Sequence, residues 1–256
     1  MKERVTLVIG RKPIILVAPH GCDDFNTDII AEEMAKQLGC YAVINRGFDR
    51  SDVVDVNNDK ANCNRVDHAK EDVVYEEFLK PIITFKNQIK KSLSSTSGPR
   101  AINNHGWGWN LPDADSSKCV ILYVHGAGNA IHRVATEEVG VIVGYGLGTK
   151  KDSFTSELWR KNLFIDLYRK YSGDGDAFEG RGGGKYAGRS TNNMNQYFRK
   201  HELDPWVDSM QLEIPYSHRK TSSRASSTAA LMSLVMKDFL KFNDVGWDAD
   251  ASPKFI

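Results

Sequence analysis

Two histidines and a pair of acidic residues follow short apolar runs of the sequence. His20, Asp23 and Asp24 come just after the run IILVA, and His125 comes directly after CVILYV. Imidazole nitrogens and carboxylate oxygens are zinc ligands, and a catalytic site with three protein ligands keeps its fourth position for water. His20 and Asp23 lie three positions apart in a glycine-containing turn, so both can reach one ion. We expect one zinc ion per chain, held by His20, Asp23 and His125, with the neighbouring acid, Asp24, as the alternative ligand.

A glutamate interrupts a third apolar run. Glu213 lies in MQLEIP, where an ionised carboxylate without a partner would be costly to bury. Zinc lowers the pKa of a bound water from 15.7 to about 7, and a nearby carboxylate can remove the proton and pass it to the leaving group. We expect Glu213 to be this base. The alternative is a structural pairing of Glu213 with an arginine.

Two other motifs near these runs suggest different chemistry. Cys22 lies between His20 and Asp23, but a Cys/His hydrolase needs a base beside the thiol. The glycine-rich stretch GRGGGKYAGR lacks the phosphate-loop spacing, because Tyr186 follows Lys185. We favour zinc chemistry over a thiol nucleophile, and we expect the glycine-rich stretch to be a loop over the pocket.

Short apolar runs that alternate with amphipathic stretches predict one α/β domain over residues 1–256. We expect strands at 14–18, 41–44, 119–124, 139–145 and 210–215. Helices are expected at 27–38, 73–93, 154–171, 189–201 and 222–242. The polar stretch 45–70 is expected to be an ordered functional loop, and 94–117 a surface excursion. Ligands of open α/β sheets collect outside the carboxyl ends of the strands, where both histidines are expected.

The composition is that of an ordinary globular protein. Of the 256 residues, 41% are hydrophobic and 26% charged, and 34 basic against 33 acidic residues give a net charge of +1. This balance gives no overall attraction to nucleic acid or to an anionic membrane. The N-terminus carries charges too early for a secretory signal, and the four cysteines lack CxxC spacing. We therefore expect reduced thiols and a cytoplasmic protein.

Four segments together resemble the N-formylglutamate amidohydrolase family: PHGCDDFNTDIIAEEMA, VVDVNNDKANCNR, LYVHGAGN and QLEIPYSHR. That family is related to the zinc carboxypeptidases and to succinylglutamate desuccinylase-like and aspartoacylase-like amidohydrolases. The resemblance implies a zinc carboxypeptidase-like fold, with three α/β/α layers around a mixed, mostly parallel sheet. It also implies the same ligands, His20, Asp23 and His125, and the same water-activating carboxylate, Glu213.

The resemblance assigns substrate contacts as well. Arg50 and the stretch 55–57, which ends at Asn57, resemble the part of the pocket that holds substrate and polarises its carbonyl. Arg219 resembles a binder of a substrate carboxylate, for which arginine offers a planar bidentate fork. Asn58 stands where many relatives carry arginine. Carboxylate recognition is then expected to move to one of three other arginines: Arg46, Arg65 or Arg189.

The expected activity is hydrolysis of an amide bond in a small anionic substrate, an N-acyl amino acid or glutamyl-type compound. Two alternatives stay open: a non-catalytic homologue that binds metal or ligand without turnover, and a peptidase that acts on larger peptides. The expected partner is the small-molecule substrate, with no nucleic acid and no membrane. The oligomeric state is not predicted.

Overall fold

The structure is a computed structural model that describes residues 3–49, 61–96, 119–127, 140–144, 158–173, 177–179, 185–204 and 207–242. Within these ranges, seven strands form one sheet in the order β1-β3-β2-β4-β7-β5-β6. The strands are β1 (Val5–Val8), β2 (Lys12–Ala18), β3 (Cys40–Asn45), β4 (Cys119–Ala127), β5 (Val141–Gly144), β6 (Ala177–Glu179) and β7 (Val207–Pro215).

The sheet is mixed and mostly parallel, as predicted. β2 is parallel to β3 and β4, β4 is parallel to β7, and β5 is parallel to β6. Only the pairs β1–β3 and β5–β7 are antiparallel among the described strands. The carboxyl ends of β2, β4 and β7 therefore meet at one edge of the sheet, and this is where ligands bind in open α/β sheets.

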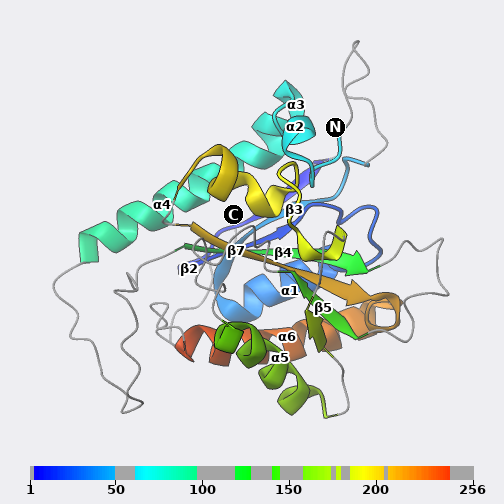
Figure 1. The fold of residues 1–256 in the computed structure, drawn as a ribbon. Helices are drawn as coiled ribbons and strands as arrows, with labels where there is room; N and C mark the ends of the chain where they lie inside the picture. The colour runs from blue at the N-terminus through cyan, green and yellow to red at the C-terminus, as the bar shows by residue number, and fades with distance from the viewer. Residues whose placement is uncertain are drawn as a thin grey trace.

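Helices cover both faces of the sheet, which gives three layers (Figure 1). One face carries α1 (Thr27–Leu38), α5 (Leu158–Ser172) and α6 (Ser222–Phe242). The other face carries α4 (Lys80–Thr96), with the short helices α2 (Val66–Ala69) and α3 (Asp72–Val74) and the π-helical turn η1 (Tyr75–Leu79) before it. The remaining turns are η3 (Lys185–Ala187), η4 (Met194–Gln196), η5 (Tyr197–His201) and η6 (Tyr216–His218).

Alternation along the central strands builds one apolar cluster on each face. On β4, Val120, Leu122 and Val124 pack towards α1, α5 and α6. Ile121 and Tyr123 pack towards α4 and η5 on the other face. Because successive side chains of a strand point to opposite faces, residue 125 lies on the same face as Tyr123.

The predicted strands and the closing helix are present, with differences only at their ends. Two strands were not predicted, β1 and β6, which have four and three residues and therefore too little pattern to read. The predicted helix over 189–201 is wrong. The chain forms the short turns η4 and η5 there, and the Asn193 side chain accepts from the Asn195 amide in place of a longer helix. No helix among the described residues is long and apolar enough to cross a membrane.

Candidate metal centre and active site

The chain turns sharply where β2 ends, and this turn carries the first two candidate ligands. The amides of Asp23 and Asp24 both donate to the His20 carbonyl oxygen, at 2.9 and 2.7 Å. A bond from residue i+4 back to residue i is a single helical turn, which places the side chains of i and i+4 on the same side. Gly21 permits the turn because a Cβ there would lie 2.3 Å from the Asn45 carbonyl oxygen.

Three buried donor side chains meet at this edge of the sheet: His20, Asp24 and His125. One ligand atom from each lies within 4.8 Å of the others, and the three residues are 7%, 5% and 2% exposed. The two imidazole rings contact each other edge to face, with centroids 5.4 Å apart. Asp24 Oδ2 also accepts from the Gly126 amide at 3.0 Å, which ties the turn to β4 directly after His125.

The carboxylate in this group is Asp24, the alternative of the sequence analysis, and not Asp23. The Asp23 side chain is half-buried and lies near Cys63. Burial raises the pKa of the Cys63 thiol well above its ordinary value, and the neighbouring Cys22 and Asp23 raise it further. The difference lies in what holds each carboxylate: the Gly126 amide binds Asp24 Oδ2, which lies 3.4 Å from His20 Nδ1.

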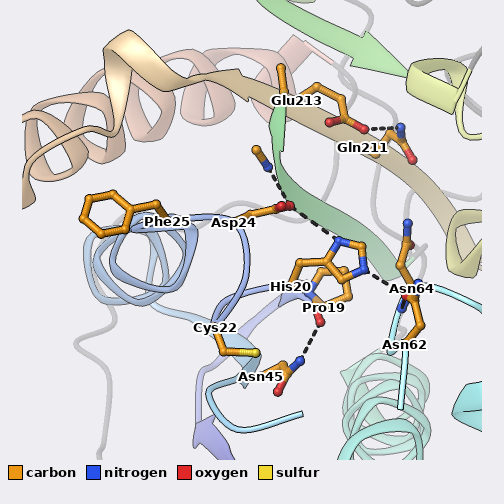
Figure 2. Close-up of polar contacts among 12 residues, drawn as sticks. Pro19, His20, Cys22, Asp24, Phe25, Asn45, Asn62, Asn64, Gln211 and Glu213 are labelled. Atoms are coloured by element: carbon orange, nitrogen blue, oxygen red, sulfur yellow. Dashed lines mark hydrogen bonds and ion pairs between the residues drawn. The ribbon is translucent and has the colours of Figure 1, made fainter. Parts of the chain in front are cut away.

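The hydrogen bonds around His20 fix which ring nitrogen faces the group. Asn62 Oδ1 accepts from the Asn64 amide at 3.1 Å and lies 2.9 Å from His20 Nε2, so Nε2 carries the proton (Figure 2). Nδ1 faces Asp24 Oδ2 at 3.4 Å, and in the neutral ring with its proton on Nε2 it has the lone pair that a metal ion needs. Metal-binding histidines commonly donate their other N–H to an oxygen in this way, which sets both tautomer and ring orientation.

These residues fit a zinc ion on two grounds. Two imidazoles and one carboxylate are a zinc donor set that leaves a fourth position for water. The 3.4 Å between Nδ1 and Oδ2 is longer than a normal hydrogen bond. It agrees with the spacing of about 3.3–3.5 Å between two ligand atoms on a tetrahedral zinc with bonds of about 2.0–2.2 Å.

Glu213 lies beside this group on the neighbouring strand. In the parallel pairing of β4 and β7, His125 and Glu213 are register partners. Their side chains therefore share a face at the edge where the His20 turn lies. Glu213 is 7% exposed, and its Oε1 accepts from Gln211 Nε2 at 2.9 Å (Figure 2). This bond holds one carboxylate oxygen and orients the side chain.

The same amide group holds the segment that precedes Arg189. Gln211 Nε2 also donates to the Tyr186 carbonyl oxygen at 2.9 Å. Gly188 packs against the Gln211 amide so closely that a Cβ there would lie 2.6 Å from Oε1, and its φ of +62° favours glycine. Arg189 is half-buried and follows directly. Tyr186 and Gly188 therefore contact the same amide group that binds Glu213.

Arg219 has no exposed fork to offer a substrate. Its side chain is 0% exposed, and the guanidinium donates to the carbonyl oxygens of Ile214, Phe25 and Ala127 at 3.0, 2.9 and 3.5 Å. These contacts give no support to the predicted role of Arg219 as a carboxylate binder. The guanidinium is buried and already binds backbone carbonyls of the fold, so a substrate cannot reach it.

Two of the three alternative arginines are also committed to acids of the chain. Arg46 pairs with Asp28 and Glu32 on α1. Arg65 pairs with Asp67 at 2.6 Å. The hydrogen bond from Arg65 is the main reason that the pKa of the Asp67 carboxyl lies below its usual range. The third, Arg189, follows Gly188, which packs against the Gln211 amide that binds Glu213. The predicted contacts Arg50 and Asn57 lie outside the described residues, as does Asn58.

Cys22 is not arranged as a nucleophile beside His20. Its Sγ donates to the Phe48 carbonyl oxygen at 3.0 Å, while the two ring nitrogens of His20 face Asp24 and Asn62. In Figure 2 the thiol and the imidazole point in different directions. The geometry favours the metal over the thiol reading.

Several residues that shape the site were missed from the sequence. Asn62 lies in the polar stretch 45–70, where no pattern distinguishes one amide from another. Gln211 carried a readable signal, because it is a second polar residue in an apolar strand and lies two positions before Glu213, on the same face. Gly126 could not be foreseen, since its importance comes from a turn about one hundred residues earlier in the chain.

Comparison with known proteins gives structural matches only. No protein-family model matches the chain, and no curated protein sequence matches it. The structure of N-formylglutamate amidohydrolase from Ralstonia eutropha matches with a TM-score of 0.57 and 11% identity, over 96% of this chain and 100% of that chain. A gene product from Agrobacterium tumefaciens matches with a TM-score of 0.51 and 12% identity, over 94% and 96% of the two chains.

A metallo-carboxypeptidase from Burkholderia cenocepacia matches at a TM-score of 0.48 and 12% identity over 93% of this chain. The chain spans only 65% of the length of that protein. At these identities the matches establish architecture and nothing finer. The chain has the three-layer α/β fold of the Ralstonia N-formylglutamate amidohydrolase structure, and the expectation of that fold is confirmed.

Proposed function

We propose that the chain is a zinc-dependent hydrolase that cleaves an amide bond in a small anionic N-acyl amino acid or glutamyl-type substrate. The observation that carries the proposal is the meeting of His20, Asp24 and His125 at one edge of the sheet, with Glu213 as the strand neighbour of His125. The fold shared with a protein named N-formylglutamate amidohydrolase supports the substrate class.

His20, Asp24 and His125 would hold the ion. When bound, zinc acts as a Lewis acid that polarises a carbonyl and lowers the pKa of a water molecule. The chain supplies the remaining steps. Gln211 orients the Glu213 carboxylate through Oε1. Glu213 accepts a proton from the attacking water as the C–O bond forms, and returns it to the nitrogen as the C–N bond breaks.

The anionic part of the substrate needs a cation near Glu213. Arg189 is the proposed group, because its segment is docked against Gln211 and its side chain keeps some exposure. Arg50 and Asn57 remain proposed substrate contacts on the family resemblance alone. Arginine suits this task because its planar fork matches a carboxylate.

The test is a hydrolysis screen of zinc-loaded protein on formyl-, acetyl- and succinyl-amino acids and on short γ-glutamyl peptides. Glu213→Gln keeps the size of the side chain and removes the base. We expect turnover by the wild-type protein and a fall in kcat of about 10²- to 10⁴-fold in the variant, the usual contribution of general acid–base catalysis.

Other results would point elsewhere. Binding of these compounds without turnover would support a non-catalytic homologue. Turnover of longer peptides only would support a peptidase. Equal turnover by wild type and Glu213→Gln would contradict the assigned base.

A further inference from the structure

Arg219 is a fully buried cation next to the candidate site. Among the described residues, Arg219 has the largest side chain that is fully buried. Burial lowers the pKa of its guanidinium, whereas the nearby negative charges of Asp24 and Glu213 oppose that shift. The same two carboxylates belong to the candidate ligand set and the candidate base. Arg219 thus balances their charge within the fold.

The carbonyl oxygens that Arg219 binds follow a pattern. Nη1 binds the carbonyl of Phe25, the residue after Asp24. Nη2 reaches the carbonyl of Ala127, two residues after His125, and Nε binds the carbonyl of Ile214, directly after Glu213. One planar group therefore contacts the backbone just beyond each of three functional side chains.

Further contacts hold the guanidinium in this place. A Cβ on Gly126 would lie 2.4 Å from Arg219 Cζ, so only glycine lets β4 pass this close. The Asn26 side chain donates to the Arg219 carbonyl oxygen at 2.7 Å, which ties the same turn to the arginine a second time. The guanidinium carbon also lies 5.6 Å from the centroid of the Tyr216 ring, within cation–π range.

We infer that Arg219 is a positioning residue for the metal site, which holds the Asp24 turn, the end of β4 and the end of β7 in register so that the site is formed before the ion arrives. The inference rests on the proposed function, because it takes His20, Asp24 and His125 as the ligands. A lysine keeps the positive charge but lacks the three-way planar fork. Substitution by lysine therefore separates geometry from charge.

The experiment measures the zinc dissociation constant of the full chain by competition with a chromophoric chelator. Loss of a group that orients ligands typically costs 10- to 100-fold in metal affinity. We expect Arg219→Lys and Arg219→Met both to weaken zinc binding by about 10- to 100-fold. The matched control is Arg46→Lys, since Arg46 is paired with α1 but not with the ligand turn. It should stay within about twofold of wild type.

Thermal unfolding with and without zinc separates positioning from general stability. A ligand that binds only the folded state raises Tm by mass action, and weaker binding shrinks that rise. The zinc-induced rise in Tm should shrink in the Arg219 variants and stay unchanged in Arg46→Lys, even where Arg46→Lys lowers the Tm of the metal-free protein.

If Arg219→Met does not fold, Arg219→Lys and Gly126→Ala decide, because a methyl group at position 126 would displace the guanidinium. Zinc binding within about twofold of wild type in both would overturn the inference while leaving the proposed function intact. A wild-type chain that binds no zinc would overturn the proposed function, and this inference with it.

Discussion

At the scale of single residues, one hydrogen bond decides which acid completes the donor set. The Gly126 amide donates to Asp24 Oδ2 and thereby holds this carboxylate beside the imidazole of His20. Asp23 is adjacent in the sequence, yet its charge acts on Cys63. The spacing of the residue types allowed either acid, since the choice depends on the backbone path of a five-residue turn.

The two aspartates therefore predict opposite results. Asp24→Asn should reduce bound zinc to well below one ion per chain, because a neutral amide is a poorer zinc ligand than a carboxylate. Asp23→Asn should keep close to one. The measurement is elemental analysis of zinc after gel filtration, on both variants and wild type. Zinc lost from Asp23→Asn and kept by Asp24→Asn would reverse the assignment.

How much of the site the sequence predicts depends on the kind of residue. His20, His125 and Glu213 were predicted because strand ends in an α/β sheet converge. Arg219 was predicted as a substrate binder and proves to be buried, because its partners are backbone carbonyls from three distant segments that no local pattern reveals. Local chemistry identifies reactive side chains, whereas their surroundings come from tertiary contacts.

At the scale of elements, the pairing of β4 with β7 aligns His125 with Glu213. It also places Gln211 where its side chain binds the Tyr186 carbonyl oxygen of the segment 185–189. One side-chain amide thus connects the candidate base to the candidate pocket loop. Parallel strands place equivalent residues at the same height along the sheet, so the register of this pair determines the geometry of the site.

Replacing Gln211 by methionine tests this connection. Methionine keeps the length of the side chain but removes the donor to Glu213 and to the Tyr186 carbonyl. We expect kcat on an N-acyl amino acid hydrolysed by wild type to fall about tenfold, part of the usual contribution of a general base. The matched control is Gln196→Met, which removes a bond to the Gly188 carbonyl of the same segment. Equal loss in both variants would show that only loop docking matters.

The element boundaries show where sequence patterns are informative. The buried strands β2 and β4 contain continuous apolar runs, and β7 alternates apolar with polar residues; all three were predicted. The region 189–201 starts with serine, threonine and asparagine residues, which favour caps and turns over a helix interior. The Asn193 cap and the Arg65–Asn193 bridge accordingly accompany short turns there.

At the scale of the whole molecule, the fold class was predicted but the strand order was not. Alternating strands and helices indicate an α/β sheet. β7 lies between β4 and β5 in the sheet. This position depends on pairing between strands that are far apart in the sequence, and the composition does not reveal such pairing. The strand order places β7 next to β4, and this brings Glu213 to the edge of the sheet where the candidate ligands lie.

His218 is one of the groups that make global stability depend on pH. Burial, followed by the charge of Arg224, lowers the pKa of this imidazole below its ordinary value of 6.5. The folded state therefore disfavours the protonated form. The stabilising contribution is present above pH 6.5 and is lost as the pH falls through the lowered value.

We expect the free energy of unfolding of wild type to fall more steeply below pH 6.5 than that of His218→Gln. Glutamine keeps a polar contact for the Tyr168 hydroxyl, which lies 3.4 Å from Nε2. The measurement is urea unfolding between pH 5 and pH 8, and the difference between the two proteins cancels the other titrating groups. Parallel curves would mean that His218 does not titrate differently in the folded state.

The most direct test of the metal centre is zinc K-edge X-ray absorption on the zinc-loaded protein. The ligand set His20, Asp24 and His125 predicts only nitrogen and oxygen neighbours at about 2.0–2.2 Å, with outer-shell scattering from two imidazole rings. His125→Ala should reduce this scattering to one ring. A sulfur neighbour at about 2.3 Å, or a spectrum unchanged by His125→Ala, would contradict the account.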